Sequence, residues 1–258
     1  MERSGRVYKK TAIVTGAASG IGKGAALLLA EEGARLVLVD QDADKLKQAD
    51  EEIRAQGGEC VAVSGDVSRM ETIDAAVSAA AGAYGGVDIV FNNAGIMPTG
   101  DIVDFLEDTW DRVLDVNLKS MFLMCKKVIP EMLKRGGGSI INTSSIMATL
   151  TEPGYTAYSA AKAGIIGLTK EIAVAYTEKG IRVNAICPGW VDTDMNRRLA
   201  EEIGGMDKLY PIFKQQQPLG RMASVREVAY AVLFLASDES TAVSGSCLYV
   251  DGAASAAI

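Results

Sequence analysis

Short apolar segments alternate with amphipathic segments along almost the whole chain of 258 residues. The apolar segments predict strands near 10–15, 35–40, 59–65, 87–92, 138–144, 181–187 and 246–250. The amphipathic segments predict helices near 20–32, 42–56, 69–84, 105–116, 118–134, 156–178 and 224–236. Such alternation is typical of parallel β-α-β units. Strands such as 139–142 are too apolar for a half-exposed position, which indicates a sheet of about seven strands with helices on both faces.

A glycine-rich turn, Thr15–Gly22, follows the first predicted strand and opens the first predicted helix. Gly16, Gly20 and Gly22 would permit tight turning and let the backbone approach a pyrophosphate at the helix N-terminus. The next strand ends at Asp40, 18 residues after Gly22. A carboxylate there can accept hydrogen bonds from ribose hydroxyls, although an Asp before a turn can also be simply solvated. The pattern predicts a dinucleotide site.

Ser145, Tyr158 and Lys162 form a second constellation, in a chain that contains no histidine. Tyr158 and Lys162 are four residues apart and so would share one face of a helix. A nearby ammonium favours the phenolate, so Lys162 is expected to lower the pKa of Tyr158. The tyrosine could then serve as general acid and base. The same spacing also occurs in ordinary surface helices, so its weight depends on the other motifs.

These motifs occur in one order along the chain: Thr15–Gly22, Asp66 with Val67, Asn92–Gly95, Asn117, the set Ser145, Tyr158 and Lys162, and Pro188 with Gly189 and Thr193. In order and spacing the chain resembles the classical short-chain dehydrogenase/reductase family over essentially its whole length. The resemblance implies one NAD-binding domain over 1–258, with a Rossmann-type doubly wound parallel sheet. It also implies an oxidoreductase that interconverts a secondary alcohol and its ketone by hydride transfer. The segment near 190–220 departs from the alternation of strands and helices, which predicts a substrate lid with short helices.

The resemblance assigns the catalytic roles to four residues. Tyr158 would exchange the substrate proton, Ser145 would donate a hydrogen bond to the substrate oxygen, and Lys162 would also bind the nicotinamide ribose. Asn117 would bend a helix and hold a water linked to Lys162, or would kink the helix without taking part in the chemistry. Ser144 is a rival to Ser145, but its spacing to Tyr158 is one residue too long.

Cofactor contacts are implied at the carboxyl ends of the strands, at Gly16, Ser19, Gly20, Ile21, Gly22, Asp40, Asp66, Val67, Asn93, Ala94, Gly95, Tyr158, Lys162, Pro188, Gly189, Val191 and Thr193. Asp66 would bind the adenine amino group, or would instead N-cap the next helix. Val191 and Thr193 would hold the nicotinamide carboxamide, unless Thr193 caps a lid helix. For Asn92, a cofactor role and a tie between strands are equally open.

The expected cofactor is NAD. A carboxylate at Asp40 would repel the 2′-phosphate of NADP, and Gln41 and Asp42 offer no arginine to bind it. Ser19 stands where NADP-using members of the family often carry a cation. Lys23 is the one cation recognised nearby, and it is interpreted as a solvated helix residue.

The substrate is less constrained by the sequence. Residues expected around it are mostly apolar: Met97, Ile146, Met147, Tyr155, Trp190 and Met195. They suggest a hydrophobic or alicyclic secondary alcohol, although such side chains also form ordinary cores. A 3-oxoacyl-thioester reductase and a non-catalytic NAD-binding scaffold remain as alternatives.

The composition of the chain bears on its binding partners and its location. A net charge of −7 argues against a nucleic acid or an anionic membrane as partner. The apolar runs are shorter than the ~20 residues of a membrane span, and the polar N-terminus suggests no signal peptide. Scattered cysteines without histidine predict reduced thiols, no metal site and a cytoplasmic location. A homotetramer is expected from the small residues Ala157, Ala161, Gly164 and Gly167 and from the apolar tail 253–258.

Overall fold

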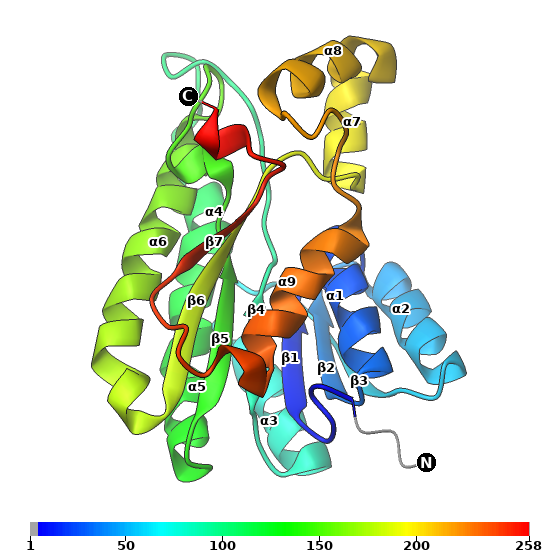
Figure 1. Cartoon of the computed structure of the whole chain (residues 1–258), viewed down its shortest axis with the longest axis vertical. Helices are drawn as coiled ribbons and strands as arrows, with labels where there is room; N and C mark the ends of the chain where they lie inside the picture. The colour runs from blue at the N-terminus through cyan, green and yellow to red at the C-terminus, as the bar shows by residue number, and fades with distance from the viewer. Residues whose placement is uncertain (1–4, 258) are drawn as a thin grey trace.

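The computed structural model describes residues 5–257, in which seven strands form one parallel sheet in the order β3-β2-β1-β4-β5-β6-β7 (Figure 1). The strands are β1 Thr11–Thr15, β2 Arg35–Asp40, β3 Glu59–Ser64, β4 Ile89–Asn92, β5 Gly138–Thr143, β6 Ile181–Pro188 and β7 Cys247–Val250. All seven predicted strands are confirmed. The first four residues and Ile258 of the expected domain lie outside the described residues.

The helices are α1 Gly20–Glu31, α2 Ala43–Ala55, α3 Met70–Tyr84, α4 Glu107–Leu114, α5 Ser120–Lys134, α6 Thr156–Tyr176, α7 Asp194–Glu202, α8 Met206–Gln216 and α9 Val225–Ala236. The predicted helices agree with these within a few residues. A π-helical turn, Asp115–Lys119, joins α4 to α5 without a break. The sequence prediction had placed a boundary there.

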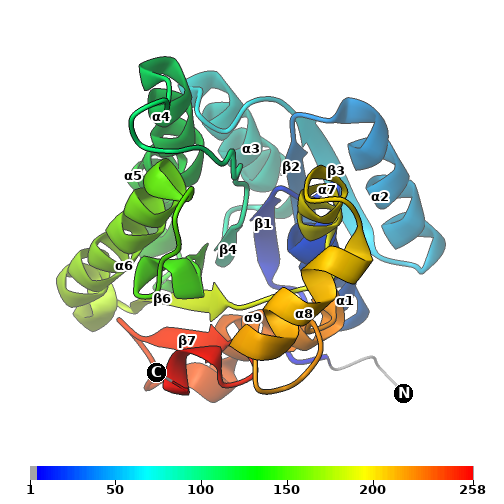
Figure 2. The ribbon, with the colours of Figure 1, turned by 90° about the horizontal axis from the view of Figure 1, so that it is seen from above.

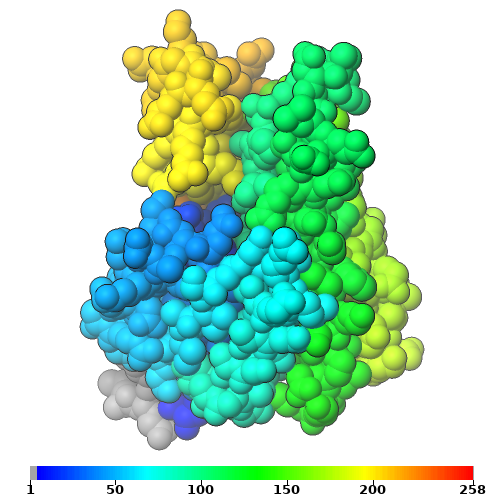
Figure 3. Space-filling model, turned by 180° about the vertical axis from the view of Figure 1, so that it is seen from behind, coloured from blue at the N-terminus to red at the C-terminus, as the bar shows by residue number. Residues whose placement is uncertain are grey.

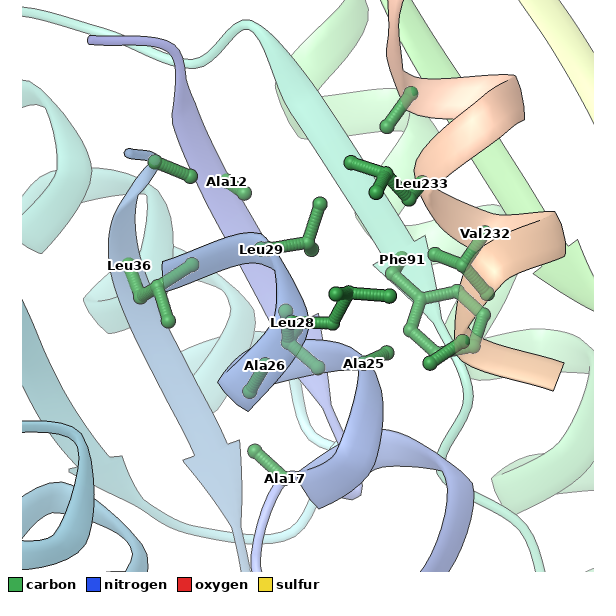
Figure 4. Close-up of a cluster of buried hydrophobic side chains, with 14 of the residues drawn as sticks. Ala12, Ala17, Ala25, Ala26, Leu28, Leu29, Leu36, Phe91, Val232 and Leu233 are labelled. Carbon is green, nitrogen blue, oxygen red and sulfur yellow. The ribbon is translucent and has the colours of Figure 1, made fainter. Parts of the chain in front are cut away.

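Two apolar layers explain why the sheet is covered on both faces. On one face, Leu28 and Leu29 of α1 meet Val232 and Leu233 of α9 above Phe91 of β4 (Figure 4). On the other face, side chains of α3, α5 and α6 form a separate cluster against the same strands. Apolar burial on both faces accounts for the nearly continuous apolar sequence of the central strands. The doubly wound α/β fold is confirmed.

Segment 190–220 departs from the alternation, as expected, and forms α7 and α8. Trp190, Ala200, Leu209 and Phe213 make a small apolar cluster that holds the two helices together. Both helices stand above the carboxyl ends of the strands, on the side of α1 and α9 (Figures 1 and 2). Ligands of such sheets bind at this edge, so these helices overhang the expected site.

Within residues 5–257, no helix is both long and apolar enough to cross a bilayer. The same part of the chain brings no three His, Cys, Asp or Glu side chains together in a group that could hold a metal ion.

Candidate active site

A cleft of about 1330 Å³ lies at the carboxyl ends of the strands. Figure 3 shows it as a hollow between the yellow atoms around α7 and the green atoms around α4. Nearly every residue predicted for catalysis, cofactor or substrate lines this one cleft. The two exceptions are Gly22 and Asn117, which do not line it.

Glycine is required in the turn between β1 and α1 for two reasons. Gly16 and Gly20 have φ angles of +65° and +52°, a conformation that side chains disfavour. At Gly22, a Cβ atom would lie only 2.0 Å from the carbonyl oxygen of Gly16. Gly22 packs α1 closely against the turn, and its contact with the cofactor stays a prediction. The turn forms a backbone cradle at a helix N-terminus, which fits a pyrophosphate.

Thr15, the first residue of the glycine-rich turn, fixes the loop after β4. Its hydroxyl oxygen accepts hydrogen bonds from the backbone N–H groups of Asn93 (2.9 Å) and Ala94 (3.1 Å). The side-chain amide of Asn93 donates back to the Thr15 carbonyl at 3.2 Å. Asn92 instead donates to Asn142 Oδ1 at 2.9 Å, which resolves its role as a tie between β4 and β5.

Asp40 ends β2 at the edge of the glycine turn. Its Oδ2 accepts the N–H of Ala18 and its Oδ1 accepts the N–H of Asp42, both at 3.0 Å. These bonds hold the carboxylate in the cleft wall and leave lone pairs free for a ribose hydroxyl. Lys23 pairs with Glu52 at 2.7 Å, in agreement with a solvated helix residue. Lys45 also lines this end of the cleft, and the sequence analysis missed it as a nearby cation.

Asp66 is held by partners that the sequence did not reveal. Its Oδ1 accepts hydrogen bonds from the N–H and the hydroxyl of Ser68, and its Oδ2 contacts Arg112 Nη1 at 2.7 Å. Burial raises the pKa of Asp66, but the hydrogen bonds from Ser68 and Arg112 outweigh it and keep the pKa below its usual value. Arg69, not Asp66, occupies the N-cap of α3. The alternative role as a helix N-cap is therefore wrong.

Asn117 lies fully buried in the π-helical turn between α4 and α5, so the predicted departure from regular helix is confirmed. Its Oδ1 accepts the N–H of Ile96 at 2.8 Å, and its Nδ2 donates to the Ile96 carbonyl at 2.9 Å. This pair of bonds positions the loop that follows β4. A water held by Asn117 and linked to Lys162 stays a prediction.

Ser145 follows β5, and Tyr158 and Lys162 lie on α6. Lys162 is only 2% exposed, and its Nζ donates to the Thr143 carbonyl at 2.7 Å. The same Nζ lies 5.3 Å from the centroid of the Tyr158 ring. Ser144 does not compete with Ser145, because its hydroxyl donates to the Lys162 carbonyl at 2.8 Å and so braces α6.

Burial has the largest effect on the pKa values of Tyr158 and Lys162. It raises the pKa of Tyr158 to about 12, and a hydrogen bond with Ser145 offsets only part of that change. Burial also lowers the pKa of Lys162 to about 8. The expected net lowering of the Tyr158 pKa is not found in this structure, because desolvation by burial is the largest effect on it. Both charged forms lose solvation, and the Lys162 ammonium is directed at the Thr143 carbonyl.

Of the two roles weighed for Thr193, capping is confirmed, and a contact with the nicotinamide carboxamide stays a prediction. Thr193 is the N-cap of α7, where its Oγ1 accepts the N–H of Asn196 at 3.5 Å. It also lines the cleft together with Pro188, Gly189 and Val191. Capping therefore fixes the start of α7 beside the glycine turn.

The substrate end of the cleft is less apolar than expected. The six predicted residues line it, with Trp190 also packed into the cluster between α7 and α8. Polar residues that the sequence analysis did not place there also line it: Thr151, Glu152, Glu202, Gln215 and Gln216. Gln216 accepts a hydrogen bond from Trp190 Nε1 at 2.8 Å and donates one to the Glu152 carboxylate.

Comparisons with known proteins agree with this geometry. Residues 16–254 match the family model described as enoyl-(acyl carrier protein) reductase. Oxidoreductase UcpA of Salmonella typhimurium is 40% identical over 251 residues, which cover 96% of this chain and 95% of the relative. FabG of Thermotoga maritima, a 3-oxoacyl-[acyl-carrier-protein] reductase, is 39% identical (96% and 98% covered). Cyclohexanol dehydrogenase of an Acinetobacter species is also 39% identical (97% and 96% covered).

Solved structures show the same architecture. A short-chain dehydrogenase/reductase structure from Burkholderia xenovorans superposes with a TM-score of 0.94 at 36% identity, covering 98% of this chain and 99% of that one. L-sorbose reductase from Gluconobacter frateurii, complexed with NADPH and L-sorbose, gives 0.92 at 32% identity, with 97% of each chain covered. The chain therefore belongs to the short-chain dehydrogenase/reductase family and is an oxidoreductase.

Proposed function

We propose that the protein is an NAD-dependent oxidoreductase that interconverts a secondary alcohol and its ketone. The convergence of Ser145, Tyr158 and Lys162 in the cleft that also holds the glycine turn and Asp40 carries this proposal. A nicotinamide cofactor bound there supplies the hydride chemistry. The 17 positions assigned to the cofactor by resemblance include 16 that line the cleft, with Gly22 as the exception.

The chain's own residues supply the proton and hold the reacting oxygen. Tyr158 as phenolate removes the alcohol proton, and as phenol it returns a proton during ketone reduction. Ser145, in contact with Tyr158, donates a hydrogen bond to the substrate oxygen as negative charge develops on it. Lys162 places a positive charge beside the Tyr158 ring and keeps β5 joined to α6 through the Thr143 carbonyl.

NAD is favoured because the Asp40 carboxylate stands where a 2′-phosphate would have to bind. The sorbose reductase complex contains NADPH, so the fold itself does not dictate the cofactor. Lys45 is a cation at this end of the cleft that could bind a phosphate. Its Nζ lies 3.9 Å from Asp42 Oδ2. Two carboxylates nearby, Asp40 and Asp42, counter its charge.

An alicyclic alcohol fits the methionine and aromatic side chains of the cleft, and cyclohexanol dehydrogenase is among the relatives. The second candidate, a 3-oxoacyl-thioester reductase, is supported by the relative FabG. Asp40 weighs against it, because an NADP preference would favour such a reductase and a carboxylate there disfavours NADP. The acidic side chains at the substrate end also weigh against it, because they repel a phosphorylated carrier. The scaffold alternative is disfavoured by the intact set of Ser145, Tyr158 and Lys162.

An NAD-linked screen over secondary alcohols, diols, sugars and hydroxy acids tests the proposed function. Formation of NADH would be followed with each alcohol, and oxidation of NADH with the matching ketones. Turnover of alicyclic alcohols would support the proposal. Turnover confined to 3-oxoacyl thioesters would favour the second candidate.

A homotetramer remains our proposal, but the surface differs from the one expected. Ala157 and Ala161 are fully buried against Val113 of α4, so they belong to the core of the subunit. Gly164 and Gly167 instead border a surface groove of about 560 Å³ with Phe122, which is 48% exposed. In the tail, Ala254 is buried and lines the cleft, and Ile258 lies outside the described residues.

Replacing Gly167 with Arg should therefore shift the protein toward smaller assemblies. A Cβ at Gly167 meets nothing within 4 Å in the subunit, so the fold should tolerate the change while the groove is blocked. Light scattering at micromolar concentration should give about four times 27.2 kDa for the wild type. Gly82→Arg on α3, where a Cβ also has open space, is the matched control. A wild-type mass of one subunit would contradict the tetramer.

A cytoplasmic location also remains a proposal. Cys60, Cys125, Cys187 and Cys247 are all free thiols, which suits a reducing compartment.

A further inference from the structure

A polar bridge connects the loop before α6 with the end of α8. In it, Gln216 donates a hydrogen bond to the Glu152 carboxylate and accepts one from Trp190 Nε1. We propose that Glu152, held by Gln216, determines substrate specificity by accepting a hydrogen bond from a hydroxyl group beyond the reacting carbinol. The preferred substrates are then neutral ring alcohols with a second hydroxyl group, and acids are rejected. This inference rests on the proposed function.

Glu152 is placed to meet the substrate. It lies six residues before Tyr158, in the short loop that also carries Tyr155, and it lines the cleft while only partly exposed. Burial raises the pKa of Tyr155, and the charges of Glu152 and Glu202 raise it further. Both carboxylates therefore act on the same part of the cleft as Tyr155, whose ring centroid is 6.5 Å from that of Tyr158.

The hydrogen bonds of Trp190 and Gln216 determine which oxygen of Glu152 can bind a substrate. The indole N–H of Trp190 can only donate, so it holds the oxygen of the Gln216 side chain. The amide nitrogen of Gln216 must then face Glu152, and it donates to Oε1. Among residues 5–257, no donor is bound to Oε2 of Glu152, which leaves this oxygen free to accept. A substrate hydroxyl is the neutral group that satisfies it.

The charges at this end of the cleft agree with that assignment. Glu152 and Glu202 both line the cleft and both act on Tyr155, and Arg198 also lines the cleft. An excess of carboxylates repels an anionic substrate and favours hydrogen-bond donors. The cleft thus offers apolar walls for a ring and an acceptor for one of its hydroxyl groups.

The test compares three kinds of probe: cyclohexanol, the three cyclohexanediols (1,2-, 1,3- and 1,4-) and 3-hydroxycyclohexanecarboxylate. For the wild type, kcat/KM should be highest for one of the diols and lowest for the acid. Glu152→Gln keeps an oxygen for Gln216 but replaces the free oxygen with an amide donor. It should lower kcat/KM for the preferred diol by about 10- to 100-fold, as expected for a lost hydrogen bond to a charged group.

The same variant should leave cyclohexanol nearly unchanged and should improve the acid. Gln216→Ala should raise KM for the diol, because it releases Glu152 from its fixed position. Glu201→Gln removes an exposed carboxylate of α7, outside the cleft lining, and is the charge-matched control. NAD affinity and thermal unfolding of each variant check that the fold is intact.

The outcomes separate the inference from the function on which it rests. Equal effects of Glu152→Gln on all three kinds of probe would mean a structural role and would overturn the inference. A wild-type enzyme that oxidises cyclohexanol at least as well as every diol would overturn it too, while leaving the proposed function standing. Absence of turnover of every alcohol with NAD and with NADP would contradict the proposed function, and the inference would fall with it.

Discussion

Replacing Tyr158 with Phe should lower kcat for alcohol oxidation by roughly 10²–10⁴-fold, the range of general acid–base catalysis. The chain contains no histidine, and Lys162 is buried with its Nζ on the Thr143 carbonyl. Tyr158 is therefore the group placed to exchange the substrate proton. The substitution keeps the ring and its packing and removes only the hydroxyl group, so NAD affinity should survive. Steady-state kinetics and NAD titration by fluorescence measure the two quantities separately.

The pH dependence gives an independent check. Alcohol oxidation needs the phenolate, and burial raises the pKa of Tyr158 to about 12, so the wild-type rate should rise as pH rises through the neutral range. Because Tyr158 and Lys162 are neighbours, the ionisation that is measured belongs to the pair. Lys162→Met removes the positive charge and should move this ionisation upward, whereas Ser145→Ala should lower the rate at every pH.

High residual activity of Tyr158→Phe would contradict this mechanism. If Tyr158→Phe kept most of the wild-type activity on a good substrate, another proton donor would have to serve. If Tyr158→Phe lost activity and NAD affinity to the same extent, the substitution would have damaged the site. Ser145→Ala leaves the Tyr158 ring in place and is the control for such damage.

Most of the fold was predictable because it depends on local patterns. Strands such as β1 and β4 are apolar on both faces, and helices such as α1 carry the apolar side chains that cover them, including Leu28 and Leu29. Each of these signals lies within a short stretch of sequence. The π-helical turn at Asp115–Lys119 was not predicted as such, because one extra residue in a helical turn leaves no clear periodicity.

The candidate site was predictable where its residues follow strands directly. The carboxyl ends of parallel strands meet at one edge, so the glycine turn, Asp40 and Ser145 were bound to lie together. The supporting contacts escaped because they join distant segments. Arg112 reaches Asp66 across 46 positions, and Gln216 reaches Glu152 across 64. No local pattern marks such pairs.

Two expectations failed because they did not account for burial. The charge of Lys162 was expected to control Tyr158, but desolvation of both groups is the larger effect. Similarly, the small residues Ala157 and Ala161 fit both a subunit interface and a core, and the structure places them in the core. A sequence shows which residues share a helix face, but it does not show what covers that face.

NAD should be preferred over NADP by about 100-fold in kcat/KM, because like charges placed side by side cost several kcal/mol. Asp40 is held in place by the N–H groups of Ala18 and Asp42, so its carboxylate has little freedom to move away from a 2′-phosphate. Asp40→Ala should narrow the preference by at least about tenfold. The change should be a higher kcat/KM with NADP, because Lys45 then faces the 2′-phosphate with one carboxylate fewer nearby.

Two further variants show whether Asp40 itself is responsible. Asp44→Ala removes an exposed carboxylate from the first turn of α2, outside the cleft lining, and should leave the ratio unchanged. Lys45→Ala combined with Asp40→Ala should remove the new NADP affinity. Dissociation constants for both cofactors, measured by fluorescence without substrate, test binding apart from turnover. A wild-type enzyme with equal affinity for both cofactors, or with a preference for NADP, would show that the Asp40 carboxylate does not face the ribose.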